Sequence, residues 1–176
     1  NIFSILLYYI IIVLYYFNYF SKKKKKSLYS NIFFSLYINM SFDNDFVNFN
    51  FNKEELIAKI FIKKEQPNVE EWNNFYEYFS NFYLACDEMN QKFILYYDLK
   101  NLGILEKEKY NQWLELFKNF EEISLKCLIC SSIITNYQPL ATIINGILIF
   151  YKNTKPVKIV TNEEDAQNFI NEHKDN

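Results

Sequence analysis

An unbroken run of apolar residues at positions 93–97, Phe-Ile-Leu-Tyr-Tyr, stands between two segments of mixed composition. The run is too short for an independent helix and is rich in residues that favour strands, so it predicts a strand buried on both faces. Such a strand is typical of the centre of a sheet that helices cover on each side. Asp98 follows where the strand leaves the core, and Gly103 permits a turn before the next helical pattern.

The segments on either side of this run predict four more strands. Residues 47–51 alternate Val, Phe and Phe with asparagines, which is the period of a half-buried strand. A turn at residues 52–54 joins it to a second predicted strand over residues 56–62, so the two form a hairpin. Mostly apolar stretches at residues 125–134 and 157–160 predict the remaining strands.

Four helices are predicted between and after these strands. Asn68 and Glu71 have the spacing of a capping box, which marks a helix start. The apolar residues after them recur at intervals of three and four and predict one buried face. These residues are Val69, Trp72, Tyr76, Phe79, Tyr83 and Cys86. Similar spacing predicts a second helix over residues 110–120, while Pro139 suits the first turn of a third and Asn162 precedes the acidic start of a fourth.

The predicted order is therefore β-β-α-β-α-β-α-β-α. After the opening hairpin each strand is followed by a helix, which calls for crossover connections and parallel pairing. We predict an α/β fold with a mixed, mostly parallel sheet and an antiparallel edge. Residues 40–176 contain no repeat and no Gly/Ser linker, so they are predicted to form one domain.

Residues 1–39 differ from this domain and have two interpretations. Residues 2–20 form an uncharged apolar segment long enough to cross a bilayer as a helix, and five lysines follow at positions 22–26. A basic cluster on that side predicts a membrane anchor with the domain in the cytosol. In the other interpretation the segment is translated AT-rich sequence upstream of a start at Met40, and the domain is a cytoplasmic protein without a tether.

Charge and composition exclude one large class of partner. Residues 40–176 carry 14 lysines and 21 acidic residues, a net formal charge of −7, and the chain has no arginine. Nucleic-acid binding needs a basic face for phosphate contacts, so no nucleic-acid partner is expected. The abundance of Asn, Lys, Ile, Phe and Tyr is typical of an AT-rich genome, so these counts carry little functional information.

No catalytic or cofactor motif is recognisable in the sequence. Cys127 and Cys130 form a CxxC inside the predicted strand. Residues three apart in a strand lie on opposite faces of the sheet, so the two thiols cannot bind the same metal ion. We interpret both thiols, and Cys86, as buried small hydrophobes. The single histidine, His173, lies near the C-terminus, and two glycines are too few for a phosphate-binding loop. We therefore expect a non-enzymatic protein with no metal and no cofactor.

One set of polar residues is a candidate binding site. Ligands of open α/β sheets bind beyond the carboxyl ends of the parallel strands. The residues expected at those ends, which we call the rim, are Asp98, Lys100, Asn101, Thr135, Asn136, Thr161 and Asn162. The alternative is that Asn, Thr and Asp stand there because turns and helix caps prefer them.

The element order, the Asp98-Leu99 exit from the central strand and the closing strand before an acidic helix start resemble STAS domains over roughly residues 45–172. That family, which includes anti-sigma-factor antagonists, is mostly non-enzymatic and binds partner proteins. Many members switch through a phosphorylatable Ser or Thr after the central strand. This chain has no Ser or Thr between Asn81 and Ile123, so the resemblance does not extend to that switch.

The sequence thus supports two hypotheses of different class. The first is a non-catalytic module that binds an unknown protein through the rim and adjacent helices. The second is a carrier of a small molecule or lipid, because residues 143–151 are almost entirely apolar. The central strand followed by Asp98-Leu99 also resembles the corresponding part of CRAL-TRIO domains. A connected apolar cavity of at least ~300 Å³ would favour the carrier. A membrane partner is expected only if residues 1–26 are expressed.

Overall fold

The computed structural model describes residues 40–150 and 155–174. The predicted anchor and lysine run lie outside the described residues. Within the described part, none of the helices has the length and apolar character needed to cross a membrane.

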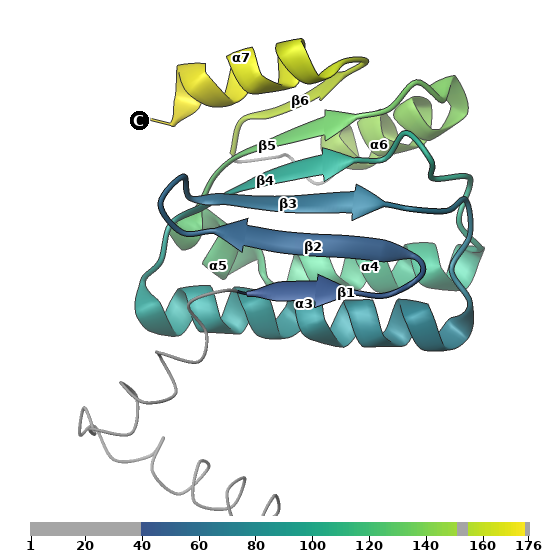
Figure 1. Cartoon of the computed structure of the whole chain (residues 1–176), viewed down its shortest axis with the longest axis horizontal. Coiled ribbons are helices and arrows are strands. Elements are labelled where there is room, and N and C mark those ends of the chain that lie inside the picture. Colours follow the sequence, from purple (N-terminus) through teal and green to yellow (C-terminus); the bar gives the residue numbers. More distant parts are fainter. Residues whose placement is uncertain (1–39, 151–154, 175–176) are drawn as a thin grey trace, which may run out of the picture. The chain divides into compact units, whose positions relative to one another are not determined.

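The described residues form a six-stranded mixed sheet with five helices (Figure 1). The elements are β1 (Ser41–Asp43), β2 (Val47–Asn52), β3 (Ile57–Ile62), α3 (Val69–Met89), β4 (Phe93–Asp98), α4 (Lys107–Asn119), α5 (Glu121–Cys127), β5 (Leu128–Ile134), α6 (Gln138–Phe150), β6 (Val157–Val160) and α7 (Glu163–His173). The strands lie side by side in chain order, with β1, β2 and β3 antiparallel and β3 to β6 parallel. The predicted α/β class and the mostly parallel sheet with an antiparallel edge are confirmed.

Two elements differ from the prediction. Strand β1 was not predicted; its three residues are too few to show a period, and it forms because Ser41 and Phe42 pair with Asn50 and Phe49 of β2. Helix α5 was also missed, and the strand predicted from residue 125 begins at Leu128 instead. Acidic residues at positions 121 and 122 favour a helix start, and the helix continues to Cys127 before the chain enters the sheet.

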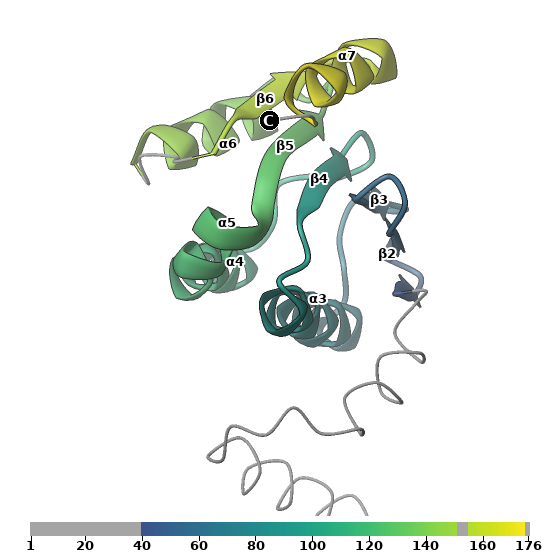
Figure 2. The ribbon, with the colours of Figure 1, turned by 90° about the vertical axis from the view of Figure 1, so that its left-hand side faces the viewer.

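The helices cover the two faces of the sheet unequally (Figure 2). Helices α3, α4, α5 and α6 lie on one face, over a large core that includes Phe49, Leu95 and Phe79. Helix α7 lies on the other face, where Phe169 and Ile170 pack against residues of β3, β4 and β5. Helices on both faces explain why β4 is an apolar run with every residue but Tyr96 buried.

Helix α3 begins where it was predicted to begin, but its buried face differs in part from the predicted one. Asn68 and Glu71 form the complete capping box. The buried residues of the helix are Glu71, Trp72, Phe75, Phe79, Phe82, Tyr83 and Cys86. The assignment of Val69 to the core was wrong, because in the first turn its side chain is 70% exposed. Tyr76 is only partly buried, while Phe75 and Phe82 take core positions.

Aromatic stacking joins α3 to α4. The ring of Trp113 lies parallel to Phe79 at a centroid distance of 5.3 Å and to Phe75 at 5.8 Å. Trp72 of α3 donates from Nε1 to Gln112 Oε1 at 2.6 Å. Stacked rings and a hydrogen bond fix the spacing of the two helices above the sheet.

Two turn predictions were partly wrong. The strand predicted from Leu56 begins at Ile57, and Leu56 closes the hairpin turn with a left-handed backbone, φ 62°. Gly103 has no positive φ, and the turn after β4 closes earlier, with a bond from Leu102 N to Leu99 O. Gly103 instead suits a close approach, because a Cβ there would lie 2.5 Å from Glu65 Cγ.

Candidate functional site

The structure brings the seven rim residues to one edge of the sheet. Asp98 ends β4, Thr135 follows β5, and Thr161 follows β6. Because these strands run parallel, their carboxyl ends lie at the same edge, as the sequence predicted. The role of the rim in binding stays a prediction.

Lys100 links the exit of β4 to the start of α7. Its Nζ lies 3.0 Å from Asp98 Oδ2 and 3.0 Å from Glu163 Oε1, and its backbone N–H donates to Asp98 Oδ1 at 3.2 Å. The hydrogen bonds to Glu163 and then Asp98 raise the pKa of Lys100. Asp98 is buried, Lys100 is one-third exposed and the side chain of Glu163 is 69% exposed, so a partner can reach both the ammonium and the Glu163 carboxylate.

Three other rim residues are engaged within the fold. Asn101 Nδ2 donates to Ile62 O at 3.0 Å, which joins the loop after β4 to the end of β3. Thr135 is 3% exposed, and its Oγ1 accepts from Tyr137 N at 3.2 Å. Asn162 caps α7, its Oδ1 accepting from Asp165 N at 2.8 Å. Turn and capping roles therefore account for these three.

An exposed aromatic residue extends the rim onto the face of the sheet that carries α7. Phe61 of β3 is 44% exposed, and it pairs in register with Asp98 of β4, so both side chains lie on the same face. At the other end of β3, Ile57 is buried in the small core beneath α7. Lys59 lies between them on this face, with Nζ 5.9 Å from the centre of the Tyr96 ring. An apolar anchor thus stands beside the charged rim.

The two cysteines of the CxxC lie on opposite faces, as predicted, although the premise that both are in a strand was wrong. Cys127 ends α5 and packs in the large core, with Sγ 3.7 Å from Cys86 O. Cys130 of β5 packs in the core beneath α7. Burial raises the pKa of Cys130 to about 11 and also raises those of Cys86 and Cys127, so all three are poor nucleophiles at neutral pH. Among the described residues there is no group of three or more His, Cys, Asp or Glu positioned for a metal ion.

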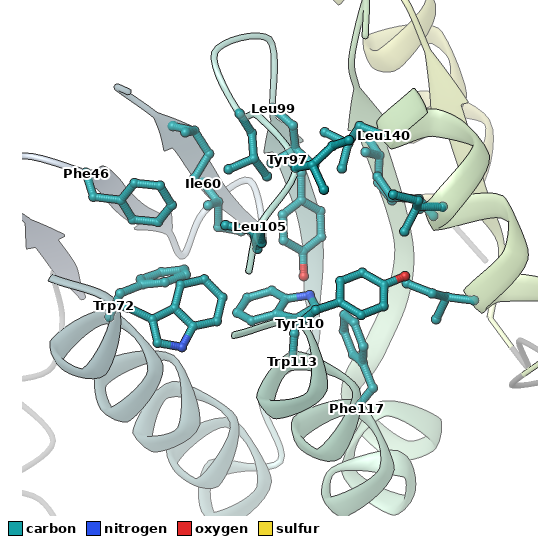
Figure 3. A pocket seen from close by; sticks show the side chains of 18 of the residues that line it. Phe46, Ile60, Trp72, Tyr97, Leu99, Leu105, Tyr110, Trp113, Phe117 and Leu140 are labelled. Atoms are coloured by element: carbon teal, nitrogen blue, oxygen red, sulfur yellow. The ribbon is translucent and has the colours of Figure 1, made fainter. Parts of the chain in front are cut away.

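An apolar cavity of about 130 Å³ lies between the sheet and helices α3, α4 and α6 and is partly open to solvent (Figure 3). Its lining is aliphatic and aromatic and comes from strands, loops and helices. The strands and the loops next to them contribute Phe46, Ile60, Ile62, Tyr97, Leu99, Leu102, Ile104, Leu105 and Ile133. The helices contribute Trp72, Phe75, Tyr110, Trp113, Phe117, Leu140, Ile143, Ile144, Ile147 and Leu148.

Tyr97 of the central strand carries a buried hydroxyl without a hydrogen-bond partner among the described residues. The residue is 6% exposed, and Figure 3 shows its oxygen pointing into the cavity toward Trp113. Burial raises the pKa of Tyr97 well above its usual value, so the hydroxyl is protonated at neutral pH and can donate. Buried polar groups are nearly always paired, which makes this one a candidate ligand contact.

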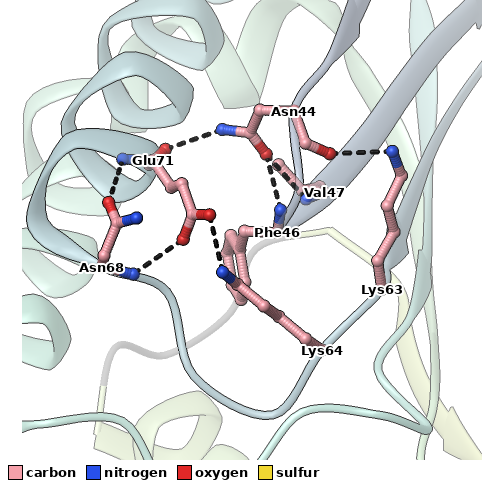
Figure 4. A network of polar contacts seen from close by, with 7 residues as sticks. All are labelled: Asn44, Phe46, Val47, Lys63, Lys64, Asn68 and Glu71. Atoms are coloured by element: carbon pink, nitrogen blue, oxygen red, sulfur yellow. Dashed lines mark hydrogen bonds and ion pairs between the residues drawn. The ribbon is translucent and has the colours of Figure 1, made fainter.

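The polar groups of a second cluster, centred on Asn44, form hydrogen bonds within the fold (Figure 4). Asn44 accepts from Phe46 N and Val47 N and donates from Nδ2 to Glu71 O at 3.0 Å. Its carbonyl accepts from Lys63 Nζ at 2.7 Å. These bonds tie the β1–β2 loop to the start of α3, so we interpret the cluster as structural.

Sequence reasoning missed Phe61 and Tyr97 as candidate site residues. Phe61 is two residues from Lys59 in the same strand, and residues two apart lie on the same face of a sheet. The sequence therefore indicated that Phe61 lies on the same solvent-facing side as Lys59. Tyr97 had no comparable signal. Its hydroxyl is without a partner because of how α4 and α6 pack over the central strand, and the sequence does not show that packing.

Comparison with solved structures found chains of similar fold. A solved structure of an uncharacterized protein from the DUF3478 family of Shewanella loihica PV-4, described as having a SpoIIAA-like fold, matches with 13% sequence identity and a TM-score of 0.49. The match covers 70% of this chain and 90% of that chain. No protein-family model matches the sequence, and no curated protein matches it.

Proposed function

We propose that the described domain is a non-catalytic protein-interaction module that binds its partner through Phe61 and the rim beside it. The observation that carries the proposal is the register of Phe61 with Asp98, which places a 44% exposed aromatic ring next to the Lys100 cluster. Protein interfaces are commonly built in this way, with aromatic anchors surrounded by polar and charged groups.

The charge of the domain indicates the chemistry of the partner. Residues 40–176 carry a net formal charge of −7, and three acidic residues, Glu163 to Asp165, form the first turn of α7 next to Lys100. Complementary charge steers association and suppresses wrong partners. The partner that fits is a protein with an apolar pocket for Phe61, acidic groups opposite Lys59 and Lys100, and basic groups opposite the acidic first turn of α7.

The chemically reactive side chains support a non-catalytic role. The three cysteines are buried in apolar cores. His173 Nδ1 lies 2.9 Å from Phe169 O in the last turn of α7, away from the rim. The helix that follows the central strand spans Lys107–Asn119 and has neither Ser nor Thr, so we propose binding that does not depend on phosphorylation there.

The test is site-specific photo-crosslinking in cells that naturally express the protein. A benzophenone amino acid replaces Phe61 in one variant and Leu84 in a control, because Leu84 is also exposed, at 50%, but lies on α3. We expect position 61 to give a defined protein adduct that position 84 does not give. The crosslinked protein is then purified, and its affinity for the full chain is measured by calorimetry.

In that binding experiment Phe61→Ala is expected to weaken the affinity by about tenfold or more, as truncation of an interface anchor does. Leu84→Ala should leave the affinity within twofold of wild type. Thermal unfolding of both variants checks that neither change acts through loss of the fold. Equal affinities for wild type and Phe61→Ala would reject this surface as the binding site.

The carrier hypothesis receives less support than the interaction hypothesis. The cavity of about 130 Å³ is smaller than the ~300 Å³ expected for a carrier site, so it does not accommodate a whole lipid. Tethering through residues 2–20 stays a prediction, and mass spectrometry of the native N-terminus tests it.

A further inference from the structure

We propose that the apolar cavity beneath α6 binds a small neutral molecule of about one ring that forms a single hydrogen bond with the Tyr97 hydroxyl. This site lies on the opposite face of the sheet from Phe61 and is independent of the protein-binding surface. Size, polarity and the orphaned hydroxyl each restrict the ligand.

The volume sets the size of the ligand. An engineered cavity of about 150 Å³ lined by Leu, Ile and Phe stays dry and binds benzene. The present cavity, about 130 Å³ with a similar lining, has nearly the same capacity. A single six-membered ring or a short alkyl group fits, whereas a fatty acyl chain or a nucleotide does not.

The lining sets the polarity of the ligand. None of the described residues that line the cavity is charged, so an ionised ligand would lose its hydration without a counter-charge. Trp72 Nε1 is paired with Gln112, and the lining also contains the polar atoms of Tyr110 and Trp113. Of the polar atoms in the described lining, the Tyr97 hydroxyl is the one that is buried without a hydrogen-bond partner. A neutral molecule with one oxygen that accepts or donates a hydrogen bond matches this arrangement.

Water is a poor alternative occupant. A buried water molecule typically needs two to four polar partners, while most of the cavity lining consists of apolar side chains such as Leu105, Ile133 and Ile144. A ligand that combines an apolar ring with one polar atom satisfies the hydroxyl and fills the apolar space together. Phenol is the simplest probe with this chemistry, and benzene is the matched probe without it.

Helix α6 provides the route of entry. Its residues Ile143, Ile144, Ile147 and Leu148 line the cavity, yet only Leu140 of its described side chains is buried. Ile149 is 80% exposed and contributes little to packing. Because the cavity is already partly open to solvent and α6 has few buried side chains, we expect a ligand to enter beside this helix.

The experiment titrates the full chain with benzene and with phenol and follows methyl resonances of isoleucine and leucine by NMR. Wild type is compared with Tyr97→Phe, which keeps the ring and removes the hydroxyl, and with Tyr137→Phe, a control at a tyrosine that is 41% exposed and does not line the cavity. We expect benzene to bind all three proteins. The ratio of phenol affinity to benzene affinity should fall roughly 3- to 10-fold in Tyr97→Phe and should not change in Tyr137→Phe.

Two results would overturn parts of the proposal and are distinguishable. If neither probe gives saturable shifts at Ile133 or Ile144 in wild type, the cavity is not a ligand site. If both probes bind but the affinity ratio is the same in Tyr97→Phe, the hydroxyl does not select the ligand. Leu105→Phe, which fills the cavity from a half-buried loop position, should abolish binding of both probes and keeps the test valid if Tyr97→Phe does not fold.

Discussion

Lys64 Nζ lies 2.6 Å from Glu71 Oε1, so an ion pair joins the chain leaving β3 to the first turn of α3. The other carboxylate oxygen, Glu71 Oε2, accepts from the backbone N–H of Asn68 at 2.7 Å and completes the capping box (Figure 4). Both contacts favour the ionised carboxylate and lower the pKa of Glu71, the Lys64 hydrogen bond having the larger effect. This arrangement makes the stability of the fold depend on pH.

We expect Glu71→Gln to reduce the loss of stability on acidification. The pKa of Glu71 is lower in the folded chain than in the unfolded chain, so its stabilising contribution is present above pH ~4.5 and is lost as pH falls through the folded pKa. Urea denaturation between pH 7 and pH 3 measures this loss as the free energy of unfolding.

Glu70→Gln is the matched control, because Glu70 is exposed in the same turn. Wild type and Glu70→Gln should lose stability in parallel on acidification, while Glu71→Gln should be less stable at pH 7 and lose less below pH ~4.5. Parallel curves for wild type and Glu71→Gln would contradict the assigned role of this carboxylate.

Lys100→Met is expected to destabilise the domain by about 1–2 kcal/mol. The change leaves the buried carboxylate of Asp98 without the ammonium that lies 3.0 Å away, and unpaired buried charges are costly. Lys126→Met is the control, since Lys126 and Asp87 are both nearly half exposed and such surface pairs stabilise little. Chemical denaturation measures both; an equal effect of the two changes would show that burial of Asp98 is unimportant.

Gly146→Ala is expected to stabilise the domain by roughly 0.5–1 kcal/mol. Gly146 is exposed within α6, no atom lies within 4 Å of a Cβ built there, and alanine reduces the entropy of the unfolded chain. Gly103→Ala should lower the stability instead, because the new Cβ would lie 2.5 Å from Glu65 Cγ and would force that side chain to move. Differential scanning calorimetry distinguishes them through a rise or a fall in Tm, and a fall for Gly146→Ala would contradict the helical packing described for α6.

The three thiols are expected to resist modification in the folded chain. Cys86, Cys127 and Cys130 are buried, and their raised pKa values keep them protonated near pH 8. An aromatic disulfide reagent should react slowly with the native protein and with all three thiols once denaturant is added. A thiol that reacts within seconds in the native state would show that one of these sites is open.

The fold class could be predicted because it follows from local periodicity. The apolar run of β4 requires cover on both faces, and the asparagine alternation of β2 requires one open face; both features were confirmed. The caps at Asn68 and Asn162 were also predictable, since their partners lie three residues away. Strand β1 could not be predicted, because three residues carry no period and pair only when β2 lies beside them.

The candidate sites depended on distances between elements that are far apart in the sequence. The positions of the rim residues follow from strand ends and parallel pairing, so the sequence by itself was sufficient to place them at one edge. Phe61 became a candidate anchor only because α7 buries Ile57 but leaves the end of β3 open. The cavity and the unpaired hydroxyl of Tyr97 exist because α4 and α6 meet the sheet with apolar side chains at a spacing that tertiary packing alone decides.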